Sequence, residues 1–176
     1  AEDLWNAFRR VTFQRAGKLS WPDLAAHLQQ QEQVLCIVNT RRAAREIFQG
    51  LSGPGNFHLS TLMYPAHRRR ILDEIRRRLR DGLPCRVVST SLIEAGVDVD
   101  FPTVYRELAG LDSILQAAGR CNREGKRPPE DSLVTIFQGE DPPPCLFETS
   151  IGAGKIVLAQ GPATAARGAG TRFFYQ

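Results

Sequence analysis

Short apolar runs alternate along the chain with longer amphipathic segments, which is the pattern of a parallel α/β sheet. Residues 34–38 form a continuous apolar run, as expected for a central strand that is covered on both faces. The clearest helix begins at Pro65, because the apolar positions between Ile71 and Leu79 recur at helical spacing, and it ends at Asp81 and Gly82. The pattern therefore predicts one sheet whose strands are connected by helices.

The same criteria predict the remaining elements and the division of the chain. Further strands are expected at residues 11–13, 57–59, 86–89, 104–107 and 133–137. Helices are expected at 21–30 and 41–49, and Ser113 is a candidate cap for another that runs to Gly119. We expect a lead-in strand and helix over 1–33, the sheet domain over 34–138, and a Pro/Gly-rich extension or linker over 139–176.

Composition narrows the class of protein. The chain has 176 residues, 42% hydrophobic and 24% charged, which suits one globular domain with a packed core. A net charge of +4 permits a polyanionic partner without requiring one. No apolar run approaches the length of a membrane span, and no secretory signal is visible. The four cysteines are far apart and lack metal-ligand spacing, so we expect reduced thiols, no metal site and a cytoplasmic protein.

Hydroxyl side chains follow one predicted buried strand. Thr90 and Ser91 come directly after the strand at 86–89, and Gly96 allows a sharp turn or a close approach to a ligand. Ligands of parallel α/β sheets bind at the carboxyl ends of the strands, where free N–H groups and hydroxyls can hold a phosphate. Such sequences are also common where no ligand binds, so this segment by itself leaves both interpretations open.

A second segment carries two arginines at helical spacing. Gln116, Arg120 and Arg123 are four and three residues apart, so a continuous helix would place all three on one face. Two guanidinium groups and an amide that converge there can bind a multiply charged anion. The alternative is a solvated helix end with basic charge near its C-terminus, which the helix dipole favours.

Together and in this order, the two segments resemble motifs V and VI of superfamily 2 helicases, in which Q-x-x-G-R-x-x-R marks the second RecA-like domain. Residues 34–40 are similar to motif IV, and the pair 59–61 and 65–68 matches the strand-to-helix turn that follows it. The sequence at 90–98 looks most like the helicase–nuclease of type I CRISPR systems. The resemblance spans residues 34–137.

The resemblance implies a RecA-like parallel sheet with helices on both faces, a P-loop NTPase-type fold. In such helicases ATP binds in a cleft between two RecA-like domains, and Arg120 and Arg123 would be arginine fingers that stabilise the transferring phosphoryl group. The resemblance assigns nucleotide-lining positions to Gln116, Gly96 and Asp98. It assigns contacts with the single strand to Thr40, Thr61, Thr90 and Ser91, and Arg68, the arginine nearest to the motif turn, is expected to contact a phosphate.

The chain lacks several motifs of a complete motor. It has no G-x-x-x-x-G-K-[ST] phosphate loop, no D-E-x-H or D-E-A-D run, and no His/Asp cluster for the two metals of a nuclease domain. The resemblance therefore implies an excised second domain that is inactive alone, with ATP and Mg²⁺ bound mainly by an absent first RecA-like domain. Its implied partners are that first domain and the nuclease domain of the same polypeptide, single-stranded DNA and a CRISPR RNA-guided surveillance complex, with no membrane.

Two other functions remain open at this point. The first is half of an RNA helicase of the DEAD-box kind, which DNA- versus RNA-stimulated turnover of the complete enzyme would distinguish. The second is a non-catalytic module that binds an anion or nucleic acid through Arg120 and Arg123, and this module would bind tightly by itself. Aromatic residues are few, at 8%, and are not interleaved with the arginines of residues 68–80, so no base-stacking platform is predicted.

Overall fold

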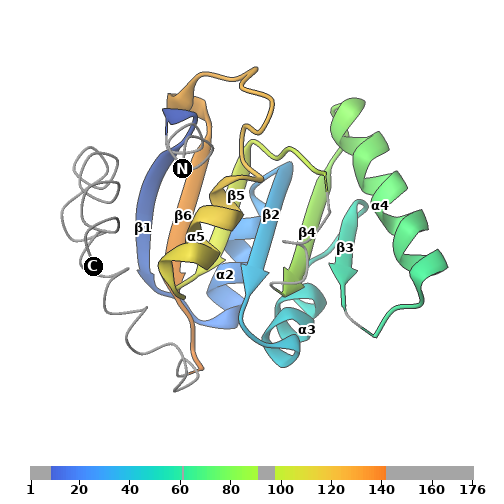
Figure 1. Ribbon diagram of the computed structural model, residues 1–176. Coiled ribbons are helices and arrows are strands. Elements are labelled where there is room, and N and C mark those ends of the chain that lie inside the picture. Colours follow the sequence, from blue (N-terminus) through green and yellow to red (C-terminus); the bar gives the residue numbers. More distant parts are fainter. Residues whose placement is uncertain (1–8, 61, 91–97, 142–176) are drawn as a thin grey trace.

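A computed structural model describes residues 9–60, 62–90 and 98–141, and the structural statements below concern these residues. They form a six-stranded sheet in which every paired strand is parallel to its neighbours, in the order β1-β6-β5-β2-β4-β3 (Figure 1). The strands are β1 (Thr12–Lys18), β2 (Gln33–Val38), β3 (Asn56–Leu59), β4 (Cys85–Thr90), β5 (Thr103–Glu107) and β6 (Leu133–Gln138). The predicted parallel α/β fold is confirmed.

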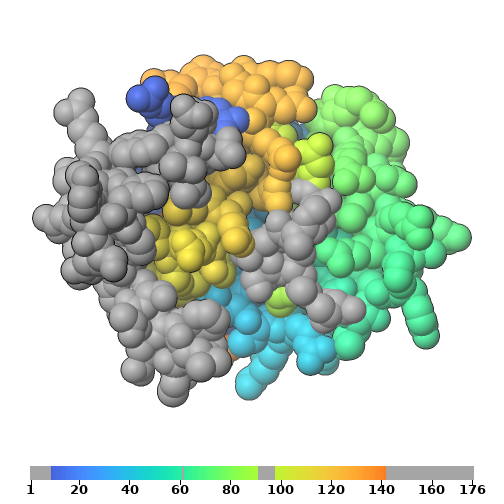
Figure 2. All heavy atoms as spheres, viewed as in Figure 1, coloured from blue at the N-terminus to red at the C-terminus, as the bar shows by residue number. Residues whose placement is uncertain are grey.

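Helices cover both faces of the sheet, which produces two hydrophobic cores. The helices are α2 (Trp21–Gln29), α3 (Arg41–Gln49), α4 (Pro65–Arg80) and α5 (Leu111–Ala118), and a 3₁₀ turn, η2, spans Pro129–Asp131. Side chains of β2 alternate between the two cores: Leu35 and Ile37 pack with α4 and α5, whereas Val34, Cys36 and Val38 pack with α2 and α3. Figure 1 shows α5 in front of the sheet and α2 behind it, and in Figure 2 the side chains of α4 form one lateral edge of the visible face.

The central position of β2 explains its sequence. All residues of the apolar run at 34–38 are fully buried, because β4 and β5 flank the strand and helices cover both of its faces. A strand with no solvent-facing side has no need for alternating polar residues. The prediction of a central strand here is confirmed.

The N-terminal elements belong to the same sheet and core. β1 pairs with β6 at the edge of the sheet, and α2 contributes Trp21, Leu24 and Leu28 to the core that also contains α3. Ser20 caps α2 by accepting a hydrogen bond from the N–H of Asp23. The predicted strand at 11–13 was too short, because β1 continues to Lys18 as an edge strand whose later residues are mostly polar and partly exposed.

The start of α5 differs from the prediction. Ser113 is the third residue of this helix and does not cap it, so that prediction was wrong. Gly110 holds the cap position with an extended backbone, and no side chain caps the helix there. Leu111 is buried, so the apolar face of α5 begins two residues before Ser113. None of the described helices combines the length and apolar character that crossing a membrane requires.

Candidate functional site

Three strand ends bring hydroxyl side chains to one edge of the sheet. Val38 pairs with Thr90, and Leu59 pairs with Ser89, so β2, β3 and β4 end at the same level. Thr40 and Ser60 follow the first two of these strands, and Thr90 ends the third. We call this region, with Thr40, Ser60 and Thr90, the carboxyl edge.

The hydroxyl groups of Thr40 and Thr90, the two described threonines of the carboxyl edge, differ in their hydrogen bonding. Thr40 is the N-cap of α3, and its Oγ1 accepts a hydrogen bond from the N–H of Ala43 at 3.2 Å. Thr90 is only 6% exposed, and its Oγ1 is buried without a hydrogen-bond partner. A buried polar group without a partner is unusual in a folded protein and points to an interaction that the folded domain by itself does not provide.

The other predicted nucleic-acid contacts are less fully described. Thr61 and Ser91, together with the predicted nucleotide-lining residue Gly96, lie outside the described residues. Arg68 is half-buried in the first turn of α4, where its N–H donates to the carbonyl oxygen of Tyr64 at 2.9 Å. Arg68 thus follows the carboxyl edge directly, because α4 begins five residues after Ser60.

Two buried residues of β5, Arg106 and Glu107, form hydrogen bonds with Asn39, the residue before Thr40. Arg106 in β5 is 2% exposed, and its Nη1 donates to Oδ1 of Asn39 at 2.9 Å. Glu107 accepts a hydrogen bond from the N–H of Asn39 at 3.0 Å. Burial raises the pKa of Glu107, and the hydrogen bond and the nearby Arg106 oppose that change. The sequence analysis missed the hydrogen bond between Arg106 and Asn39. Nothing in the sequence of a strand indicates that its arginine is buried and binds a residue 67 positions away.

The predicted helical face of Gln116, Arg120 and Arg123 does not form. Helix α5 ends at Ala118 with Gly119 as its C-cap, so Gln116 is on the helix and both arginines lie beyond it. The chain then turns, and the carbonyl oxygen of Arg120 accepts from the N–H of Phe101 at 2.9 Å beside the bridge between Phe101 and Cys121. The helix stops here because this pairing replaces helical hydrogen bonds. We call residues 119–127 the arginine loop.

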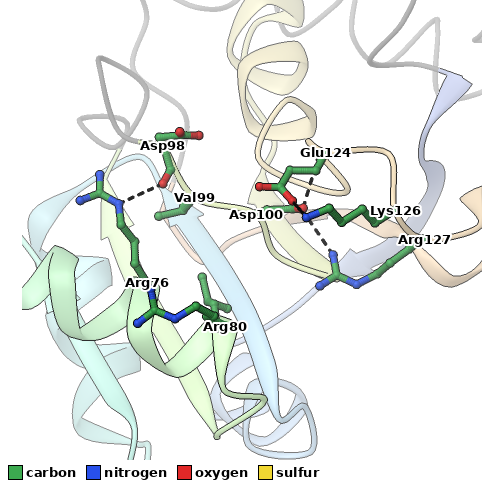
Figure 3. A pocket seen from close by; sticks show the side chains of 9 residues that line it. Arg76, Arg80, Asp98, Val99, Asp100, Glu124, Lys126 and Arg127 are labelled. Carbon is green, nitrogen blue, oxygen red and sulfur yellow. Dashed lines mark hydrogen bonds and ion pairs between the residues drawn. The ribbon is translucent and has the colours of Figure 1, made fainter.

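The structure nevertheless brings Asp98 and Arg123 together. Nε of Arg123 lies 3.0 Å from Oδ1 of Asp98, and both side chains are exposed. The main-chain oxygen of Asp98 also accepts from Nε of Arg76, on the C-terminal half of α4, at 3.2 Å (Figure 3). Two of the predicted nucleotide-site residues, which come from different motifs, therefore form one ion pair near the amino end of β5.

Asp100 fixes the main chain of the arginine loop. Its carboxylate accepts hydrogen bonds from the N–H groups of Arg123 at 2.9 Å and Glu124 at 3.4 Å, and from the guanidinium of Arg127 at 3.4 Å. These bonds join segments more than 20 residues apart in the sequence. Spacing could not reveal them, and Asp100 was missed for that reason.

Asn122 is the second residue that sequence reasoning missed. It is 1% exposed and has a φ of 48°, in the left-handed region, which asparagine tolerates better than most residues. Its side-chain amide donates to the carbonyl oxygens of Arg10 and Arg127 and accepts from the N–H of Arg127, at 2.7 to 3.0 Å. Nη1 of Arg10 in turn donates to the carbonyl oxygen of Arg123. An asparagine shortly after a helix-ending glycine was the available signal.

A pocket of about 570 Å³ opens between α4 and the arginine loop. Its polar lining comprises Arg76, Arg80, Asp98, Asp100, Glu124, Lys126 and Arg127 (Figure 3). Several of these charges are paired across its wall, such as Lys126 with Glu124 and Arg127 with Asp100. Among the described residues, no group of three or more His, Cys, Asp or Glu side chains could hold a metal ion.

Comparison with known proteins places the chain in a family. The family of the C-terminal part of the CRISPR-associated nuclease/helicase Cas3 matches residues 30–126, more than half of the chain. The chain belongs to this family. It is a Cas3-like helicase C-terminal domain, and the resemblance to the second RecA-like domain of a CRISPR helicase–nuclease is confirmed.

Two curated Cas3 nuclease/helicases show the extent of the similarity. The protein of Haloferax volcanii is 44% identical over 75 residues, which is 42% of this chain and 8% of that protein. The protein of Methanothermobacter thermautotrophicus is 31% identical over 115 residues, which is 63% of this chain and 14% of that protein. The chain therefore spans only a small part of the length of these relatives.

Solved structures support the Cas3-like fold. The crystal structure of T. fusca Cas3-ATP matches 74% of this chain and 18% of that chain with a TM-score of 0.57 and 19% identity. The DUF1998 helicase MrfA bound to DNA matches 74% of this chain and 20% of that chain, with a TM-score of 0.55 and 22% identity. A CRISPR RNA-guided surveillance complex before nicking matches 81% of this chain and 20% of that chain, with a TM-score of 0.55 and 18% identity.

Proposed function

We propose that this Cas3-like domain is the second motor domain of an ATP-dependent helicase that translocates on single-stranded DNA in CRISPR antiviral defence. The observation that carries this proposal is the ion pair between Asp98 and Arg123, which joins the two motif segments at 3.0 Å. It forms on an exposed surface, where a second domain could complete a cleft. Membership of the Cas3 family supports the same proposal.

The arginine loop suits a polyphosphate. The guanidinium of Arg123 is partly exposed, and it already binds one anionic oxygen, so a phosphate oxygen matches its present partner in chemistry. Arg120 and Arg123 would hold the phosphates of ATP as arginine fingers, and Gln116, Gly96 and Asp98 would line the nucleotide. ATP supplies the phosphoanhydride bond whose hydrolysis powers movement. We assign Mg²⁺ mainly to the first RecA-like domain, because the resemblance to superfamily 2 helicases places the Mg²⁺-binding acidic motif there.

The carboxyl edge suits the backbone of a single strand. Thr90 has a buried hydroxyl with no hydrogen-bond partner, and a phosphate oxygen is an acceptor that could supply one. Thr40, Thr61, Ser91 and Arg68 complete the proposed contacts. MrfA, a structural neighbour, is bound to DNA, and this supports the choice of nucleic acid as the ligand.

The domain should have no motor activity by itself. The curated relatives extend far beyond the part that this chain matches, so we propose that a first RecA-like domain and a nuclease domain of the same polypeptide complete the enzyme. We further propose a CRISPR RNA-guided surveillance complex as its recruiting partner, since such a complex is among the structural neighbours.

Substitution of the two arginines tests the proposal in the complete polypeptide. Arg120→Ala and Arg123→Ala should each reduce ATP turnover about 1,000-fold or more, the contribution of an arginine finger, and leave single-strand binding nearly intact. Arg15→Ala is the matched control, because Arg15 is an exposed arginine on the edge strand β1 and does not line the pocket beside the arginine loop. Near-normal ATP hydrolysis by Arg120→Ala would contradict its assignment as a finger.

A mixing experiment tests whether the domain is half of an active site. ATP turnover is measured for this chain with and without single-stranded DNA, and again after the first RecA-like domain is added or fused. We expect no turnover by the chain alone and DNA-stimulated turnover after reconstitution. Robust turnover by the chain alone would require a complete phosphate site within it, and the proposal would then be wrong.

A further inference from the structure

Two large apolar residues are exposed in the turn between β3 and α4. The backbone of this turn leads into α4 at the lower right of Figure 1. Leu62 is 77% exposed and Tyr64 is 83% exposed. The only other large apolar residue that is exposed within the described ranges is Leu83, at the opposite end of α4. Most tyrosines bury a large part of their ring, so this degree of exposure suggests a surface that binds a partner.

The turn holds Tyr64 in a fixed place. Met63 packs against the core, its N–H donates to the carbonyl oxygen of Ser60 at 3.3 Å, and its Sδ accepts from the N–H of Ser60 at 3.5 Å. Oγ of Ser60 also accepts from the N–H of Leu62 at 3.2 Å. Pro65 restricts the backbone of Tyr64 to the extended region, which it occupies with φ −60° and ψ 142°. The ring can therefore bind a partner with little loss of backbone freedom.

The helix that begins beside Tyr64 carries uncompensated positive charge. The first turn of α4 contains no acidic residue, and two further arginines, Arg69 and Arg70, follow it directly. The acidic residues of α4, Asp73 and Glu74, pair with arginines further along the helix. Arg69 and Arg70 form no ion pair with any described residue, and both are exposed. The surface next to the tyrosine thus favours an anionic partner.

This surface adjoins the carboxyl edge. Leu59, the last residue of β3, pairs with Ser89, so Ser60 lies beside Thr90 and the turn that leads to Tyr64 starts at the carboxyl edge. A ligand here needs negative charges for the arginines and a flat face for the ring. Asp and Glu side chains of an acidic peptide offer charge without a flat face, whereas a single strand offers a phosphate and an unstacked base at every nucleotide.

We propose that Tyr64 stacks on an unpaired base of the nucleic acid strand while Arg69 and Arg70 contact its phosphates. The inference rests on the proposed function and adds a base contact to it. The sequence alone gave no indication of a stacking platform, because a single tyrosine is not a pattern of interleaved aromatic residues. The stacking surface becomes visible only when the exposure of Tyr64 and the pairing of the distal arginines are known.

Binding of two oligomers to the complete polypeptide tests the proposal. Oligo-dT and an abasic oligomer of the same length carry the same phosphates, but only the first offers bases. Tyr64→Ala should weaken binding of oligo-dT roughly 5- to 100-fold, the effect expected for one stacked base, and should change binding of the abasic oligomer little. Tyr64→Phe keeps the ring and should bind as the wild type does. Leu83→Ala is the control for loss of an exposed apolar side chain elsewhere.

A fluorescent variant provides a second measurement that does not depend on affinity. Tyr64→Trp should show quenched tryptophan fluorescence when oligo-dT is added and little quenching with the abasic oligomer. The natural tryptophans of the polypeptide, which include Trp5 and Trp21 of this chain, are corrected for by the same titration of the wild type.

The outcomes separate the stacking inference from the proposed function. If the wild type binds oligo-dT and Tyr64→Ala binds it equally well, the stacking inference is overturned and the motor-domain proposal stands. If Tyr64→Ala weakens both oligomers to the same degree, the ring has no base contact and the inference fails. If the wild type binds neither oligomer, both proposals fail.

Discussion

Replacement of Asn122 by alanine tests whether one buried amide holds the arginine loop in place. The substitution removes three hydrogen bonds to main-chain groups, one at Arg10 and two at Arg127. A typical hydrogen bond stabilises the fold by about 0.5 to 1.5 kcal/mol. Arg10 and Arg127 are partly exposed, so water can replace part of this loss, and the hydrogen-bond contribution lies near 2 kcal/mol if each bond is given about 0.7 kcal/mol.

The backbone of Asn122 adds a second contribution. At a φ of 48° an alanine is strained by about 1 to 2 kcal/mol, which asparagine reduces by local hydrogen bonding. We therefore expect Asn122→Ala to lower the free energy of unfolding by roughly 3 kcal/mol in total. Asn122→Gly loses the same hydrogen bonds but avoids the strain, so it should be about 0.5 to 1 kcal/mol more stable than the alanine variant after the flexibility of glycine is considered.

Urea denaturation of the wild type and both variants measures these differences, with unchanged m-values as the condition for comparing midpoints. A loss below about 1 kcal/mol for Asn122→Ala would refute the argument that this amide organises the loop. A glycine variant less stable than the alanine variant would refute the backbone contribution. In the complete polypeptide, the same alanine substitution should reduce ATP turnover, because the segment that Asn122 holds carries Arg123.

Three further predictions concern other parts of the domain. Gly55→Ala should destabilise the fold by roughly 1 to 3 kcal/mol more than Gly82→Ala. Both glycines have a positive φ, but only a Cβ at Gly55 would lie 2.1 Å from a main-chain oxygen. Thermal denaturation of the two variants measures the difference. Burial raises the pKa of the Cys121 thiol to about 12. Cys121 should therefore resist alkylation by iodoacetamide at pH 8 in the folded chain and react in urea, which peptide mapping measures. Rapid labelling of Cys121 in the folded chain would contradict this prediction. Thr90→Val removes a hydroxyl that has no hydrogen-bond partner, so the free energy of unfolding should stay within about 0.5 kcal/mol of the wild-type value. The same substitution should weaken DNA stimulation of the complete enzyme more than its nucleotide affinity. An unchanged DNA titration would count against the role of Thr90.

The sheet could be predicted because its elements obey local rules. The apolar run at 34–38 predicted a strand buried on both faces, and the helical spacing after Pro65 predicted α4 at its full length. Predictions failed where a tertiary contact decided the boundary. β1 continues to Lys18 because β6 pairs with it, although its own residues are largely polar.

The sequence indicated which residue types form the candidate site, but it indicated their arrangement in space only in part. Helical spacing placed Gln116, Arg120 and Arg123 on one face, but the helix ends before the arginines because Phe101 pairs with the chain after it. The ion pair of Asp98 with Arg123 joins the two motif segments, although no spacing in the sequence predicted it. Asp100 and Asn122 could not be found from spacing, since their partners are distant in sequence or are main-chain groups.

Thr90 and Asp98 belong to the same motif but lie at opposite ends of the sheet. β4 ends at Thr90 on the carboxyl edge, and the parallel β5 begins at Thr103 at the amino ends of the strands. Asp98 precedes Thr103 by five residues and forms its ion pair with Arg123. One motif therefore contributes to both ends of the sheet, while the other contributes only to the end with the arginines. A substitution at Thr90 and one at Arg123 should for this reason affect strand binding and ATP turnover separately, and equal effects of both on both activities would contradict this division.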